Sequence, residues 1–161
     1  MAIIVLLVGI VAVAQLVPAS ISSNSSNRND SSALVFAQRE LAQMLSQQLN
    51  MSISPPAFID AEGNSCNLGD PTQPGQTIGS PVVLDINNRP VIDFTAAQVL
   101  NYSFNYPDPN DPYRTVYDVR WAVITTTKNG LVTAKRFVLG ARKQGGNGFF
   151  QPVTLDTMVE R

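Results

Sequence analysis

Residues 1–17 read MAIIVLLVGIVAVAQLV, and this stretch is the strongest structural signal in the 161-residue chain. Gln15 is its only polar side chain, and no charged side chain occurs before Arg28. A helix over residues 2–17 would be apolar on every face and about 24 Å long. The hydrocarbon core of a bilayer is about 30 Å thick, so the run is slightly short for a span. The candidates are a core helix, a signal peptide, a membrane helix and a helix buried in an assembly.

The signal-peptide interpretation has one feature in its favour. Ala12-Val13-Ala14 fits a small-x-small cleavage site. Signal peptides also carry positive charge before the apolar run, and neither Lys nor Arg stands there. An ordinary single-pass anchor is a second alternative. We favour a third, a helix that is buried in a polymer.

The residues that follow predict a change of helix character. Pro18 stands where the helix could bend, and residues 19–32 (ASISSNSSNRNDSS) have poor helix propensity. Residues 33–50 (ALVFAQRELAQMLSQQLN) favour an amphipathic helix, which Asn50 and Pro55-Pro56 end. The apolar positions of this helix, which we expect to pack on a sheet, are Leu34, Ala37, Leu41 and Leu45.

The segments VLLVGIVAVAQLVPASISSNSSNRND and ALVFAQRELAQMLSQQLN resemble the N-terminal region of type IV pilins and pseudopilins, particularly minor pilins. The resemblance implies one long helix that lies in the bacterial inner membrane and later packs in a filament core. Pro18 would be the family's helix break. The implied partners are inner-membrane lipid, the pilus or secretion assembly machinery and copies of the chain in a helical filament, which would be extracellular or periplasmic. The side chains that the resemblance assigns to assembly are Ile3, Ile4, Leu6, Leu7, Ile10, Val13, Leu16 and Val17.

The chain departs from the family pattern at one point. The family has a Glu a few residues after a methylated Phe or Met, whereas residues 1–17 contain no acid. Either the mature chain begins a few residues upstream of Met1, or this is a variant that lacks the Glu. We expect the first, because it also lengthens the apolar run to a full span.

The rest of the chain favours antiparallel strands. Residues 51–80 are rich in Gly and Pro and predict a long connection. Two alternating runs flank Asn129-Gly130, a pair that favours a tight hairpin turn. We therefore expect an α+β fold, with the long N-terminal hydrophobic helix packed on a small antiparallel sheet, as in pilins. The expected units are a helix over 1–50, divided into 1–17, 18–32 and 33–50, and a β-rich head over 51–161. The expected strands are 82–86, 91–94, 101–106, 116–127, 131–142 and 153–158.

Composition argues against most chemistry. The net charge of -1 disfavours nucleic acid as a partner, since phosphate binding needs a basic face. The chain has no His and one Cys, which removes the commonest general base and any thiolate metal cluster. We expect no enzymatic activity, no cofactor and no bound metal.

The remaining polar candidates receive structural interpretations. Asp108, Asn110 and Asp111 are possible Ca²⁺ ligands but favour a turn, and Asp60, Glu62 and Asp70 are interpreted as solvated loop acids. Cys66 is expected to be a partly buried thiol, and Trp121 a core residue.

The predicted function is therefore structural. We expect a subunit of a type IV pilus-like extracellular filament, which assembles through its hydrophobic N-terminal helix. The alternatives are a membrane-anchored or secreted β-rich adhesion module, and a pseudopilin of a type II secretion system.

Overall fold

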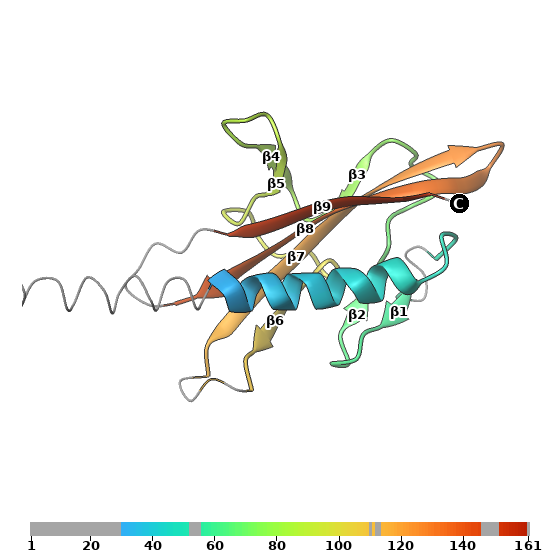
Figure 1. Cartoon of the computed structure of the whole chain (residues 1–161). Helices are drawn as coiled ribbons and strands as arrows, with labels where there is room; N and C mark the ends of the chain where they lie inside the picture. Colours follow the sequence, from blue (N-terminus) through green and yellow to red (C-terminus); the bar gives the residue numbers. More distant parts are fainter. Residues whose placement is uncertain (1–29, 52–55, 110, 112–113, 146–151, 161) are drawn as a thin grey trace, which may run out of the picture.

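The structure is a computed structural model, and it describes residues 30–51, 56–109, 111, 114–145 and 152–160. Its largest feature is a five-stranded antiparallel sheet, crossed on one face by a helix over residues 30–46 (Figure 1). The sheet order is β3-β7-β8-β9, and β6 also pairs with β7. The five strands are β3 (Thr77–Gly79), β6 (Ser103–Pro107), β7 (Val116–Lys128), β8 (Leu131–Gln144) and β9 (Val153–Glu160).

The long hairpin of β7 and β8 confirms the prediction made from alternation and from Asn129-Gly130. Lys128 pairs with Leu131 across a two-residue turn, in which Asn129 has φ 54° and Gly130 φ 77°. Positive φ at both positions is the requirement of a type I′ turn, and Asn-Gly meets it at low cost. One register shift, between Thr126 and Thr127, accommodates a bulge near the turn.

Two small hairpins lie outside the main sheet. β1 (Phe58–Ile59) pairs with β2 (Ser65–Cys66), and β4 (Val82–Leu84) pairs with β5 (Pro90–Ile92). The β4–β5 hairpin packs on the sheet face opposite the helix, where Ile92 and Phe94 contact the position of Gly140. A Cβ at Gly140 would approach both side chains to 3.0 Å, so glycine gives the hairpin its room.

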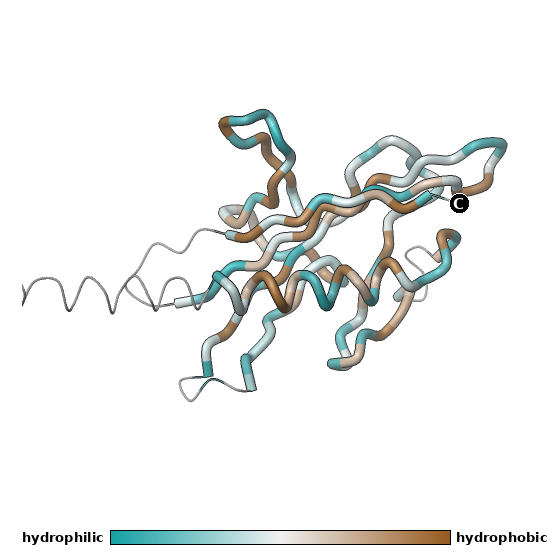
Figure 2. The backbone as a smooth tube through the Cα atoms, in the orientation of Figure 1, coloured by the Kyte–Doolittle hydropathy of each residue, from teal (hydrophilic) through white to brown (hydrophobic). Residues whose placement is uncertain are grey.

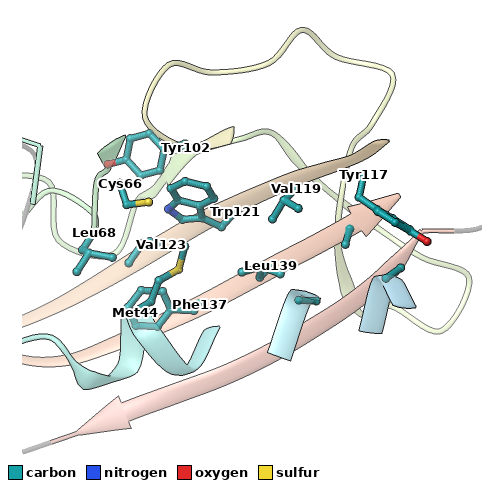
Figure 3. Packing of buried hydrophobic residues seen from close by; sticks show 13 residues of the cluster. Met44, Cys66, Leu68, Tyr102, Tyr117, Val119, Trp121, Val123, Phe137 and Leu139 are labelled. Carbon is teal, nitrogen blue, oxygen red and sulfur yellow. The ribbon is translucent and has the colours of Figure 1, made fainter. Parts of the chain in front are cut away.

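The main core lies between the helix and the sheet (Figure 3). Alternate residues of β7 point to the helix side, where Trp121 and Val123 are fully buried, and β8 adds Phe137 and Leu139. Along the backbone tube, apolar and polar stretches alternate on the helix, as expected for an element with one covered side (Figure 2).

The buried side of the helix differs from the apolar pattern in the sequence. Its buried positions are Ala33, Ala37, Glu40 and Met44. Of the residues expected to face the sheet, Ala37 is fully buried, Leu41 and Leu45 are partly buried against the core, and Leu34 is 36% exposed. The small Ala33 and Ala37 let the helix backbone approach the sheet closely, which turns the larger Leu side chains toward the edge of the contact.

The expected α+β fold with a long packed N-terminal helix is wrong for the described chain, which is 45% strand and 14% helix. The helix ends at residue 46, earlier than predicted, because side chains compete for its last carbonyls. The Ser46 hydroxyl and the Gln47 side-chain amide both donate to the Gln43 carbonyl, at 2.7 and 3.3 Å. Strands dominate because β7 and β8 alone contain 13 and 14 residues.

The expected localisation in a bacterial inner membrane before assembly is also corrected. Among the residues that the structure describes, no helix combines the length and the apolar character that a bilayer crossing requires. The helix over 30–46 carries the ionisable side chains of Asp30, Arg39 and Glu40. Pro18 and the assembly side chains predicted within residues 3–17 lie outside the described residues.

Candidate functional site: a buried carboxyl and thiol cluster

Three side chains with acidic protons meet between the helix and the β1–β2 hairpin. Glu40 comes from the helix, Asp60 follows β1, and Cys66 lies in β2. One carboxylate oxygen from each acid and the Cys66 sulfur lie within 4.8 Å of one another, and the three residues are 2%, 6% and 0% exposed. We refer to these three residues as the Glu40 cluster. Buried carboxyl groups at this spacing are rare without a compensating charge, which makes the cluster the leading candidate for a functional site.

The helix positions Glu40 through its own periodicity. Glu40 follows Ala33 by seven residues and Ala37 by three, so it lies on the same side of the helix as these two buried alanines. Met44, one turn further, is also buried in the main core. The sequence therefore contained a signal for Glu40, since its position continues the small-residue side of the helix rather than the leucine side.

Gln43 connects the helix to the turn of the β1–β2 hairpin. Its Oε1 accepts the Ala61 backbone N–H at 2.8 Å. Its Nε2 lies 3.4 Å from Glu40 Oε2 and 3.5 Å from Glu62 Oε2, and donates to both. Next to it, Arg39 forms an ion pair of 3.0 Å with Glu62. The contact between the helix and this hairpin is thus polar at its centre.

Asp60 is fixed by the turn that connects β1 and β2. Its Oδ1 accepts the backbone N–H groups of Glu62 and Asn64 at 3.0 and 2.6 Å, and its Oδ2 accepts the Asn64 side-chain amide at 2.7 Å. Three donors directed at one carboxyl group suit its charged, acceptor-only form. Asp60 therefore presents a negative charge to Glu40 and cannot turn away without loss of the turn.

Glu40 is the carboxyl group of the cluster whose pKa changes most. Burial, and then the charges of Asp60 and Glu62, raise the pKa of Glu40 from an ordinary 4.5 to about 7. The Cys66 thiol donates to Glu40 Oε1 across 3.7 Å, and burial next to this carboxyl group raises the pKa of Cys66. A thiol under these conditions stays protonated and unreactive.

The cluster has the residue types of a metal site but not the usual arrangement. Zinc sites supply three or four deprotonated ligands, most often from Cys and His. Here the Asp60 oxygens already accept three hydrogen bonds, and the thiol environment opposes loss of its proton. The environment of the Glu40 cluster therefore suits a bound proton better than a metal ion.

Lys135 is a further buried ionisable group, on the side of the sheet that the helix covers. It is 1% exposed, and its Nζ donates to the carbonyl of Leu68 at 2.6 Å and to the carbonyl of Met51. Burial lowers the pKa of Lys135 to about 8. Further along the sheet, Trp121 Nε1 donates to the Asn67 carbonyl at 2.9 Å. These bonds attach the segment that follows β2 to the main sheet.

A buried ion pair lies on the other face of the sheet. Arg120 donates from Nε and Nη2 to Asp118 at 2.8–3.0 Å, and from Nη1 to the Ala96 carbonyl at 2.7 Å. The Phe94 ring has the Arg120 and Arg142 guanidinium groups at 5.1 and 4.8 Å from its centroid. Each of the three guanidinium nitrogens of Arg120 donates a hydrogen bond within the protein. Arg120 therefore anchors the loop before β6 and is not directed at a ligand site.

The candidate residues from the sequence agree with the structure in part. Asp60 and Asp70, expected to be solvated, are buried, and Asp70 caps its own turn through Thr72 at 2.8 Å. Cys66 is fully buried rather than partly buried, and Trp121 lies in the core as expected. Asp111 accepts hydrogen bonds from Thr115, which is a turn role, and Asn110 lies outside the described residues.

Comparison with known protein families, with curated proteins and with solved structures finds no match for this chain. Its function must therefore be argued from its own residues.

Proposed function

We propose that this chain is a structural subunit of a type IV pilus-like filament, which assembles with copies of itself through residues 1–17. The observation that carries the proposal is the presence of a long apolar run beside a head whose described residues already pack a core of their own. Trp121, Phe137 and Leu139 are at most 1% exposed, and the helix over 30–46 covers them.

The energetic argument concerns the apolar run. Each large aliphatic side chain that leaves water contributes about 1.5–3 kcal/mol. Residues 1–17 hold a continuous series of such side chains, so they need cover from another surface. Identical runs from neighbouring copies supply that cover by symmetry, and a head-to-tail arrangement that does not close on itself makes a filament.

The test compares two sets of charged substitutions in the full chain. The double variant Leu7→Asp, Ile10→Asp places charge within the apolar run, and we expect it to abolish filaments seen by negative-stain electron microscopy. Leu131→Asp is the matched control, because Leu131 is 72% exposed at the β7–β8 turn. We expect this control to assemble normally. Filaments of normal length from the double variant would overturn the proposal.

A second candidate is a β-rich interaction module, and one observation favours it. The β4–β5 hairpin exposes Val83, Leu84 and Ile86 to 47%, 62% and 101%. A group of exposed aliphatic side chains on a projecting hairpin is typical of a protein contact. Under this second function, Leu84→Asp with Ile86→Asp would abolish binding of a partner, whereas the apolar run would be dispensable.

A further inference from the structure

The β1–β2 hairpin lies outside the five-stranded sheet. Its two strands share two residue pairs. Beyond Cys66, the chain is tied to the sheet by the bonds from Trp121 to Asn67 and from Lys135 to Leu68. Because neither β1 nor β2 pairs with a strand of the main sheet, a movement of the hairpin about residues 67–68 would leave the strand pairing of that sheet intact.

The helix side of the contact is held more firmly. Ala37 and Met44, one turn on either side of Glu40, are at most 1% exposed in the main core. Movement of the helix would uncover Ala37 and Met44, so we expect repulsion between helix and hairpin to move the hairpin, which lies outside the main sheet.

The charges that face Glu40 are unbalanced. Asp60 and Glu62 face it from the turn between β1 and β2, the Cys66 thiol from β2, and Arg39 from its own helix. Arg39 is already paired with Glu62, and within the described residues Glu40 forms no ion pair. A proton on Glu40 removes the repulsion with Asp60, because Asp60 is fixed by its own turn donors.

We propose that Glu40 is a proton-dependent switch: with its proton bound it holds the β1–β2 hairpin against the helix, and loss of the proton opens this contact. The geometry and the missing counter-charge support the switch, and the pKa of about 7 places the upper end of the change near neutral pH. The switch goes beyond assembly and does not depend on it. Its direct consequence is that Cys66, which has no exposed surface in the closed form, becomes accessible at higher pH.

The test uses Cys66 as the reporter in the full chain. Labelling by 4,4′-dithiodipyridine is followed from pH 5 to pH 8.5 in the wild type and in Glu40→Gln. The neutral Gln imitates the protonated carboxyl group. Dividing the wild-type labelling rate by the Glu40→Gln rate at each pH removes the pH dependence of the thiol reaction itself, which is common to both proteins. We expect the ratio of the wild-type rate to the Glu40→Gln rate to be lowest at pH 5, to rise by up to tenfold for each pH unit between pH 5 and 7, and to level off above pH 7.

A ratio that stays constant across this range overturns the proposal. A second measurement covers the case in which Glu40→Gln does not fold, namely the ¹³Cδ titration of Glu40 by NMR in the labelled wild-type chain. We expect a midpoint near 7, which coincides with the pH at which the labelling ratio levels off. In Glu62→Gln, one repelling charge is lost and Arg39 is released, so both midpoint and amplitude should fall. A Glu40 midpoint near 4.5, or a midpoint unchanged by Glu62→Gln, contradicts the switch.

Discussion

The equilibrium stability of Glu40→Gln gives the most demanding test of the buried cluster. The folded chain holds the Glu40 proton more tightly than the unfolded chain, because its pKa is about 7 against an ordinary 4.5. Stability from this group is complete below pH 4.5, since both states are protonated there. It falls as pH rises from 4.5 to 7, where only the unfolded state releases the proton, and it stays low above 7.

The size of the effect follows from the shift. A difference of about 2.5 pKa units corresponds to about 3 kcal/mol at 1.36 kcal/mol per unit. Glu40→Gln removes the titration and keeps the shape, so the variant should be more stable than the wild type by about 3 kcal/mol at pH 8, and equal to it at pH 4.5. If the β1–β2 hairpin opens at lower cost, the difference levels off at that opening cost.

Urea unfolding of both proteins at pH 4.5, 6, 7 and 8, followed by Trp121 fluorescence, measures this difference. Other titrating groups, such as Asp70, are common to both proteins and cancel. The exposed Glu160 provides a control, because Glu160→Gln makes the same chemical change outside the cluster. A difference between wild type and Glu40→Gln that does not grow with pH would refute the account of the cluster.

Two further predictions concern the sheet. Gly79→Ala should destabilise the fold by more than 2 kcal/mol, on the order expected for overpacking plus strain, because its φ is 117° and a Cβ would lie 2.5 Å from the Tyr102 ring. Gly75→Ala, with φ 77° and open space around it, should cost only about 1 kcal/mol, and equal losses in urea unfolding would contradict the packing argument. Arg120→Leu leaves the Asp118 carboxylate buried and should cost about 3 kcal/mol in thermal or urea unfolding. Adding Asp118→Asn should recover part of that loss, and a double variant no better than the single would show that the buried charge is not the cause.

Much of the sheet could be predicted because its signals are local. The alternation in residues 116–142 and the Asn129-Gly130 turn depend on neighbouring residues only, and the observed hairpin follows them. The helix was also predictable, although its end was not. Ser46 and Gln47 have ordinary propensities, and their bonds to the Gln43 carbonyl are visible only in the folded chain.

The meeting of Glu40, Asp60 and Cys66 could not be predicted from local sequence patterns. The prediction placed Leu34, Ala37, Leu41 and Leu45 on the buried side of the helix, and Ala37 is fully buried, but the most buried positions around it are Ala33, Glu40 and Met44. This difference places Glu40 in the core. Asp60 and Cys66 are six residues apart in a Gly-rich connection, and only the two-pair hairpin of β1 and β2 brings them to Glu40.

The sequence by itself determined the strand alternation, the tight turn and the presence of an apolar run with no charge before Arg28, since these depend on residue type and spacing. Only the tertiary structure decided which side of the helix is covered and which ionisable groups share a buried space. The physical reason is that burial and charge repulsion are properties of groups brought together from distant segments. No single segment of the chain contains both Glu40 and the fixed carboxylate that faces it.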